Sequence, residues 1–84
     1  MKVRSAAKLV EERAKTHGDF ADNCAAFDRL LKALPLEGFD ERIRYPVAMI
    51  YTKLVRLHSG RLERQHIEDI EGYAHLMMGL VSPP

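Results

Sequence analysis

The chain has 84 residues and a formal net charge of +1, with thirteen Lys or Arg and twelve Asp or Glu. This length predicts one domain, residues 1–84, and the interspersed charges argue against a dedicated nucleic-acid surface. The single cysteine excludes an intramolecular disulfide, and no apolar run is long enough to cross a membrane. The free cysteine and the lack of a signal-peptide pattern predict a cytoplasmic protein. Because so small a domain usually needs support, we expect a homodimer.

The first two predicted helices are joined by a short turn. The first runs from Ser5, a suitable N-cap, to about Thr16, and Gly18 can take the left-handed backbone that ends a helix. The second begins at Asp19, as N-cap, and runs to Leu34. Its apolar residues recur at helical spacing and predict one buried stripe, which includes the cysteine: Phe20, Cys24, Phe27, Leu31 and Leu34.

The second half of the chain predicts a loop and two more helices. The loop covers Pro35–Tyr45. The third helix begins at Pro46, runs through to His58 and is ended by Gly60, and its apolar face is wide enough to contact more than one neighbour. The fourth covers about Leu62–Leu80, where Gly72 costs roughly 1 kcal/mol against alanine unless something packs close to it. Its predicted apolar seam is Ile67, Ile70, Ala74, Met77 and Val81.

The sequence therefore predicts an all-α fold, without strand alternation or internal repeats. We expect a small bundle of four helices in two antiparallel hairpins, because the turns between helices one and two and between three and four are short. The four histidines lack the spacing of a zinc site, and each is expected at the surface or at a helix end: His17, His58, His66 and His75.

Asp69 is the acid that most needs a partner, because it flanks the apolar seam of the fourth helix. Lys53 and Arg56, one helical turn apart on the third helix, are the natural partners. One interpretation is a phosphate or metal site that also draws on Asp19 and Tyr73. The other is a structural ion pair that locks helices three and four together. The sequence leaves both open.

Three segments carry a resemblance to a known family. "ERAKTHGDFADN" resembles ER-x-K-x-[YH]-GD-x-x-x-N, "MIYTKLVRL" resembles a helix with K-x-x-RL, and "EDIEGYAHLM" resembles D-I-x-GYA-x-L. In this order, over about Glu11–Leu80, they are similar to a family of small helical proteins common in phages and prophages. That family is distantly similar to the MazG-like all-α nucleoside triphosphate pyrophosphohydrolases.

The resemblance implies a dimeric helical protein that binds nucleotides with Mg²⁺. In the MazG-like superfamily, acids of an EExxE and an ExxD segment hold the metal ions. Glu11 and Glu12 match the first two acids of EExxE, but Lys15 occupies the third place. Asp69 matches the acid of ExxD, with His66 three residues before it. The resemblance thus implies Glu12 and Asp69 as metal ligands in an incomplete set.

Two functions follow as hypotheses. The first is a MazG-like protein that binds, and in a stronger form hydrolyses, nucleotides, with ligand-binding residues Asp19, Lys53, Arg56, Asp69 and Tyr73. The second is a non-enzymatic phage or prophage protein that binds or inhibits a host factor, such as a nuclease or a defence complex. The incomplete acid set and the apolar C-terminal segment with Met77, Met78 and Leu80 motivate the second, which is the alternative to the preferred first hypothesis.

Overall fold

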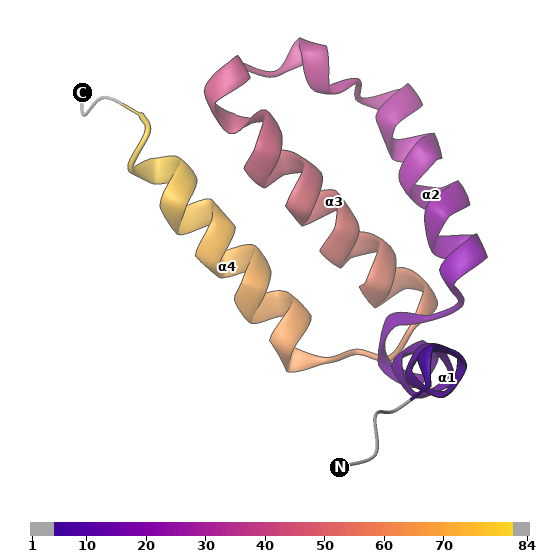
Figure 1. The fold of residues 1–84 in the computed structure, drawn as a ribbon. Coiled ribbons are helices and arrows are strands. Elements are labelled where there is room, and N and C mark those ends of the chain that lie inside the picture. Colours follow the sequence, from indigo (N-terminus) through magenta and orange to yellow (C-terminus); the bar gives the residue numbers. More distant parts are fainter. Residues whose placement is uncertain (1–4, 82–84) are drawn as a thin grey trace.

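The computed structural model describes residues 5–81, which form four α-helices and no strand (Figure 1). The α-helices are α1 (Ala6–His17), α2 (Phe20–Ala33), α3 (Arg44–Ser59) and α4 (Arg64–Met78). Two short 3₁₀ helices, η1 (Leu36–Gly38) and η2 (Glu41–Ile43), connect α2 to α3. The all-α class and the four predicted helices are confirmed.

The predicted N-caps of α1 and α2 are both present. The Ser5 hydroxyl accepts a hydrogen bond from the Lys8 N–H at 3.2 Å. The Asp19 carboxylate accepts from the Asp22 N–H at 3.0 Å. These bonds satisfy backbone donors that a helix start leaves without an internal partner, so local sequence fixes both helix starts.

Helix α3 is the middle of the fold, with α2 on one side and α4 on the other (Figure 1). Among residues 5–81, the large apolar side chains that are almost fully buried all come from α3: Val47, Tyr51 and Val55. The predicted contact of its wide apolar face with more than one neighbour is confirmed. The three helices lie side by side in one layer, and α1 projects from one face of that layer.

Helix α1 packs against α3 rather than alongside α2. The short turn between α1 and α2 is present as predicted, but α1 is seen nearly end-on in the view that shows α2 lengthwise (Figure 1). The reason lies in Gly18, whose φ of 81° and ψ of −178° turn the chain sharply between the two helices. Few residues other than glycine adopt that backbone.

The predicted loop at 35–45 is more regular than expected. It holds η1, η2 and the first residues of α3, which begins at Arg44, ahead of Pro46. The Arg44 guanidinium donates to the Phe39 carbonyl at 3.1 Å and to the Glu37 carbonyl at 3.2 Å. These bonds give the backbone groups of the connection a partner, which periodicity alone does not reveal.

An exposed ion pair between Asp40 and Arg42 caps the N-terminal end of η2. The Asp40 carboxylate accepts from the Arg42 N–H at 2.9 Å and from the Arg42 guanidinium at 3.0 Å. This guanidinium lowers the pKa of Asp40 to about 2. Asp40 is thus a cap of a short helix, and its charge is already neutralised within the chain.

The predicted buried stripe of α2 is wrong. Phe20 is 74% exposed, Leu34 is 54% exposed and Cys24 is also exposed, so the cysteine is not a core residue. Phe27 and Leu31 are half-buried, and the Phe27 ring meets the Tyr51 ring edge-on at a centroid distance of 6.4 Å. Because α2 packs along a single helix of the layer, most of its apolar stripe stays uncovered.

The predicted seam of α4 is correct at Ile70 and Met77 but wrong at its three other positions. Ile67 is 44% exposed and Val81 is 62% exposed, and Ala74 is exposed as well. The residues at helical spacing with the lowest exposure are instead His66, Ile70, Tyr73 and Met77. A Cβ added to Gly72 would meet no atom within 4 Å, so this glycine serves no close contact. Within residues 5–81, no helix is long and apolar enough to cross a membrane.

Candidate ligand-binding site

The turn after α1 packs directly on the turn after α3. We call this contact the joint, and it consists of residues 16–18 against residues 59–60. A Cβ on Gly18 would lie 2.5 Å from the Ser59 hydroxyl, and a Cβ on Gly60 would lie 2.5 Å from the Thr16 carbonyl oxygen. Only glycine allows the two backbones to approach this closely. The joint fixes the C-terminal end of α1 against the C-terminal end of α3.

Asn23 ties the joint together from the first turn of α2. Its amide nitrogen donates to the His17 carbonyl oxygen, and its amide oxygen accepts from the Ser59 hydroxyl. On the other side, the Arg61 guanidinium donates to the Lys15 carbonyl at 2.9 Å. The last carbonyls of α1, which have no partner inside the helix, are thereby satisfied by side chains from α2 and from the turn after α3.

His66 is buried beneath the joint, with 3% of its surface exposed. Its Nε2 lies 3.2 Å from the Thr16 carbonyl oxygen, so Nε2–H donates there, while Nδ1 has no partner among the described residues. The prediction that His66 lies at the surface or caps a helix is wrong. Its place on the packed side of α4, under the end of α1, depends on tertiary contacts that sequence spacing does not encode.

His17 lies beside His66, with ring centroids 5.0 Å apart in an edge-to-face arrangement. Its Nδ1 is 2.7 Å from the Thr16 hydroxyl. Partial burial lowers the pKa of His17, and the nearby positive charge of Arg56 lowers it further, with smaller contributions from His66 and other basic side chains. The basic side chains around His17 thus disfavour a further positive charge on its ring.

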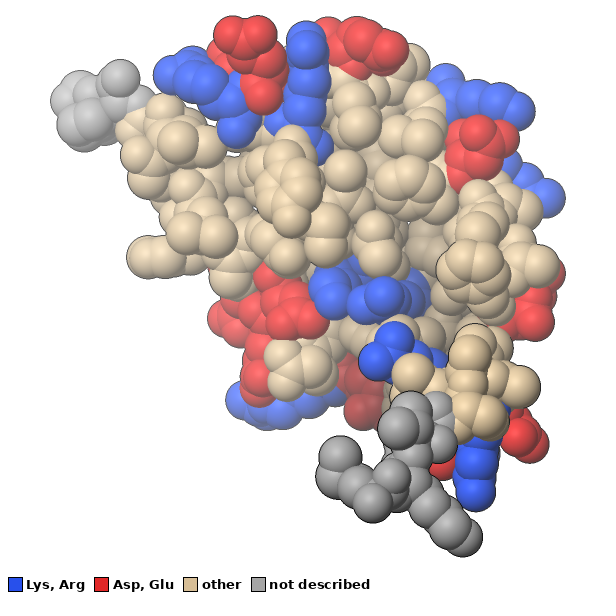
Figure 2. All heavy atoms as spheres, viewed as in Figure 1, with Lys and Arg blue, Asp and Glu red and all other residues tan. Residues whose placement is uncertain are grey.

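A cavity of about 600 Å³ opens beside α1, between α1, the start of α2 and α3. We call it the α1 cavity. Its apolar wall consists of Ala7, Val10, Ala14 and Phe20. Its basic residues are Arg13, His17 and Arg56. The acidic side chains of Glu11 and Asp19 and the amide of Asn23 also line it. Figure 2 shows a group of Lys and Arg atoms near the centre of this face, with Asp and Glu atoms and uncharged surface beside them.

The predicted contact between Lys53 and Asp69 is present. Lys53 Nζ lies 3.0 Å from Asp69 Oδ2, and the Gln65 amide donates to Asp69 Oδ1 at 2.8 Å. The Lys53 ammonium lowers the pKa of Asp69, and the Gln65 hydrogen bond lowers it further. Both carboxylate oxygens already have partners in the chain, so this geometry favours the ion pair that links α3 to α4 over a ligand site.

The five predicted ligand-binding residues do not share one cavity. Asp19 and Arg56 line the α1 cavity, although the Asp19 carboxylate also caps α2. Lys53 and Asp69 pair with each other between α3 and α4. Tyr73 is half-buried on α4, beside Asp69 in a shallow surface depression. The structure thus separates the predicted set into a cavity part and an ion-pair part.

The predicted metal ligands lie on different helices, Glu12 half-buried on α1 and Asp69 on α4. Within the described part of the chain, no three His, Cys, Asp or Glu side chains are placed to hold a metal ion. Mg²⁺ at Glu12 and Asp69 therefore stays a prediction.

Residue-by-residue reasoning missed several members of the site. Asn23 and His17 both occur in the "THGDFADN" segment, so that motif was the available signal for them. Phe20 was assigned to the core because of its spacing, yet it lines the α1 cavity. Comparison with known proteins adds no relative: no family model, no curated protein and no solved structure matches this chain.

Proposed function

We propose that this protein binds a nucleotide in the α1 cavity, with the phosphates at Arg56. The observation that carries the proposal is the environment of Arg56. Its side chain is half-buried, yet it makes no ion pair with any described residue, and its charge acts on His17 together with those of Arg13 and Lys53. A charged group taken partly out of water needs an opposite charge. A phosphate would supply it.

The cavity offers two kinds of contact that a nucleotide uses. The Arg56 guanidinium can hold two phosphate oxygens at once through parallel hydrogen bonds. Phe20, 74% exposed at the cavity wall, presents an aromatic face on which a base can stack. The volume of about 600 Å³ lies within the range of small-molecule sites. The carboxylates of Glu11 and Asp19 also line the cavity, and the Asp19 carboxylate already caps α2. Because the apolar side chains offer a contact to a base, the cavity favours a nucleotide over a free anion.

We propose binding rather than hydrolysis as the main activity. Cleavage between phosphates requires dense positive charge, commonly from two metal ions held by several carboxylates. The acids that the MazG-like resemblance implies are incomplete, since Lys15 and His66 stand at two of the matched acid positions. Mg²⁺ would then arrive as the counter-ion of the triphosphate. This proposal rests on the cavity and does not depend on the resemblance.

Thermal unfolding with and without nucleotides tests the proposal. A ligand at ten times its Kd stabilises a folded protein by about 1.4 kcal/mol, which raises Tm by about 5–10 °C in a domain of this size. We expect such a shift with a nucleoside triphosphate, in the presence or absence of Mg²⁺. Arg56→Gln should abolish it. The matched control is Arg64→Gln, because the Arg64 side chain is 89% exposed on α4 and, among residues 5–81, pairs with Glu68.

Two results would count against the proposal. One is the absence of any shift with the common ribonucleotides and deoxyribonucleotides at millimolar concentration. The other is an equal loss of the shift in Arg56→Gln and Arg64→Gln, which would indicate a general charge effect. Release of pyrophosphate, measured in the same samples, separates binding from hydrolysis.

A second candidate is a protein that binds a host factor, as the phage-like resemblance implies. The apolar side chains exposed near the end of α4 favour it: Leu76 is 64% exposed and Met78 is 71% exposed. Exposed apolar groups that lie close together often mark an interaction surface. A partner recovered with the unmodified chain should be lost with the double variant L76R/M78K. Its retention would exclude this surface.

A further inference from the structure

His17 is one of the residues that line the α1 cavity, together with Arg56 and Arg13. Its ring also meets the ring of His66 edge-on, at a centroid distance of 5.0 Å. The two histidines differ in access: His66 is buried and does not line the cavity, whereas His17 is half-buried and does. Of this pair, His17 is therefore the histidine that a ligand in the cavity would meet.

The hydrogen bonds at the end of α1 determine which nitrogen of His17 can accept a proton. The Thr16 hydroxyl donates to the Arg13 carbonyl at 3.2 Å, so its oxygen remains as an acceptor for the His17 ring. His17 Nδ1 lies 2.7 Å from that oxygen, and Nδ1–H therefore donates to it. Nε2 is then the basic nitrogen of the neutral ring.

This Nε2 atom is accessible. Among residues 5–81, the only enclosed side-chain nitrogen or oxygen without a hydrogen-bond partner is His66 Nδ1, and His17 Nε2 is not of that kind. The hydrogen bond of the His17 ring within the chain is made by Nδ1. Nε2 is thus available to a proton from solvent and to a ligand in the cavity.

The groups around His17 oppose a proton there. Partial burial and then the positive charge of Arg56 lower the pKa of His17. Three more basic side chains act in the same direction, one each on α4, α3 and α1: His66, Lys53 and Arg13. The cavity also holds the carboxylates of Glu11 and Asp19, and Asp19 caps α2. Because the pKa is lowered in spite of these carboxylates, the side chains of the cavity by themselves disfavour a proton on Nε2.

A bound anion would reverse this balance. Phosphate oxygens held by the Arg56 guanidinium would offset its charge and add negative charge to the cavity that His17 lines. An opposite charge within about 4–6 Å favours the protonated form of a histidine. The protonated ring would then present Nε2–H as a donor to the ligand.

We propose that His17 takes up a proton at Nε2 when an anionic ligand occupies the α1 cavity, so that the ligand binds more tightly as the solution becomes more acidic. This inference rests on the proposed function, because it requires a phosphate-bearing ligand at Arg56. It adds a form of regulation to that site, namely control of affinity by pH. The proton comes from solvent and returns to solvent when the ligand leaves.

The sign of the effect follows from the linkage between proton and ligand. Binding is weakest at high pH, where His17 is neutral with and without ligand. Affinity then increases as pH falls through the pKa of His17 in the complex. The gain is complete once pH lies below the pKa of His17 in the free protein, which is lower than the usual 6.5. A difference of one pKa unit between the two states corresponds to about a tenfold change in affinity.

NMR of the histidine rings tests the proton uptake directly, since the Cε1–H signal of each of the four histidines reports its own protonation. The His17 signal is assigned through the backbone and checked by its loss in His17→Gln. We expect its titration midpoint to rise by about one pH unit with millimolar ATP. His58 and His75 are internal controls, because both are exposed and neither lines the α1 cavity. Their midpoints should move much less.

Arg56→Gln and Arg64→Gln form a matched pair of variants for this measurement. In Arg56→Gln, ATP should no longer move the midpoint of His17, whereas the exposed Arg64 on α4 should be replaceable without effect. In addition, Arg56→Gln should raise the midpoint of His17 in the absence of any ligand, because it removes a positive neighbour. An unchanged midpoint in ligand-free Arg56→Gln would contradict the assigned coupling.

The outcomes separate this inference from the proposed function. If ATP shifts the signals of Phe20 and other cavity residues but leaves the His17 midpoint in place, proton uptake is wrong and nucleotide binding stands. If ATP changes no signal, both are overturned. Equal movement of the His17, His58 and His75 midpoints indicates general screening and also overturns the inference.

Affinity for inorganic sulfate gives an independent readout, because the charge of sulfate is constant between about pH 5 and pH 8, where histidine titrates. We expect the unmodified chain to bind sulfate about ten times more tightly at the acid end of this range. His17→Gln should lose most of this pH dependence. Undiminished pH dependence in His17→Gln would assign the proton to another group and remove His17 from the proposal.

Discussion

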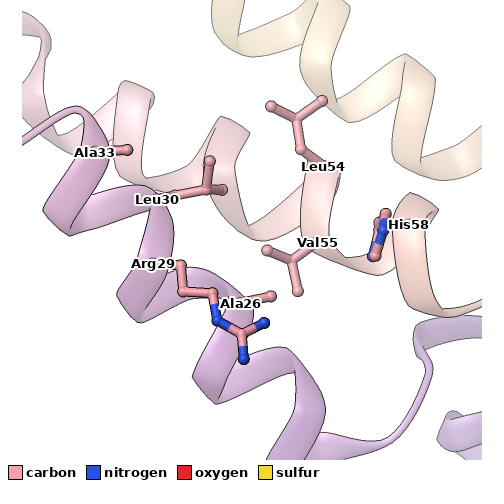
Figure 3. Close-up of a pocket in the computed structure, with 7 residues that line it drawn as sticks. All are labelled: Ala26, Arg29, Leu30, Ala33, Leu54, Val55 and His58. Atoms are coloured by element: carbon pink, nitrogen blue, oxygen red, sulfur yellow. The ribbon is translucent and has the colours of Figure 1, made fainter.

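The joint and the groove between α2 and α3 both use α3, yet they are built in opposite ways. The apolar side chains that line this groove are Ala26, Leu30, Ala33, Leu54 and Val55 (Figure 3). In the joint, the two backbones lie in close contact, and polar groups of Asn23, Arg61 and His66 satisfy the carbonyls at the end of α1. In the groove, apolar side chains line an open space of about 510 Å³. The joint is complete within one chain. In the groove, Leu54 is 44% exposed, and apolar surface in contact with water contributes less stability than the same surface when covered.

This difference indicates where a single chain derives its stability. Outside α3, the described chain buries few large side chains, so the joint and the ion pair between α3 and α4 hold the elements in place. The following changes test that division, beginning with the largest expected effect.

Gly60→Ala should disrupt the joint. The added Cβ would lie 2.5 Å from the Thr16 carbonyl oxygen and 2.8 Å from the Arg56 carbonyl oxygen, and these backbone atoms cannot move aside cheaply. We expect a loss of about 3 kcal/mol in the free energy of unfolding, the upper range for overpacking, measured by chemical denaturation.

The matched control is Gly72→Ala. Its Cβ meets nothing within 4 Å in the middle of α4, so the better helix propensity of alanine should add about 0.5–1 kcal/mol to the free energy of unfolding. If both substitutions change stability in the same direction, the joint is not a tight contact.

Asn23→Ala should have an intermediate effect. It removes the donor to the His17 carbonyl and the acceptor for the Ser59 hydroxyl, and leaves both without that partner. We expect a loss of about 1–2 kcal/mol in denaturation experiments. Ala25→Ser, an exposed change in the same helix, is the control and should be nearly neutral. An equal loss in the two variants would contradict the role assigned to Asn23.

Asp69→Asn should have the smallest effect, and that effect should depend on pH. The Lys53 ammonium lowers the pKa of Asp69 below its usual 3.8 in the folded state. The ionised carboxylate therefore stabilises the fold above pH 3.8, and this contribution disappears as pH falls through the lowered pKa. Asp69→Asn should melt at a lower temperature than the unmodified chain at pH 7. A difference that persists undiminished at the acid end would rule out the ion pair as its cause.

The helices could be predicted from local sequence because their ends are set by residues that are close together in the chain. Ser5 and Asp19 cap α1 and α2 with bonds to N–H groups three residues ahead, and Gly18 supplies the turn between them. Burial could not be predicted in the same way. The apolar spacing of Phe20 and Ile67 fits a core face, but the single layer leaves no helix to cover either side chain.

The candidate site can be divided in the same way, into contacts that local sequence predicts and contacts that tertiary packing decides. The Lys53–Asp69 contact could be predicted because a helical hairpin brings the two residues together. The α1 cavity could not, because it depends on α1 projecting out of the layer, which is decided by backbone contact between Gly18 and Gly60. Beside this contact His66 is buried against the Thr16 carbonyl, and the positive charge of Arg56 lies close enough to His17 to lower the pKa of His17.

The joint anchors α1 at its C-terminal end, so a small rotation there would move its N-terminal end over a longer distance. A helix of twelve residues is about 18 Å long, and α1 is anchored at its C-terminal end, where Thr16 and His17 meet the rest of the chain. A rotation of about 10° at that anchor would displace the far end by roughly 3 Å, since a helix of this length moves as a stiff rod. Val10 and Ala7 lie along this arm. A small adjustment between the two glycines would therefore change the width of the α1 cavity, because α1 forms its wall.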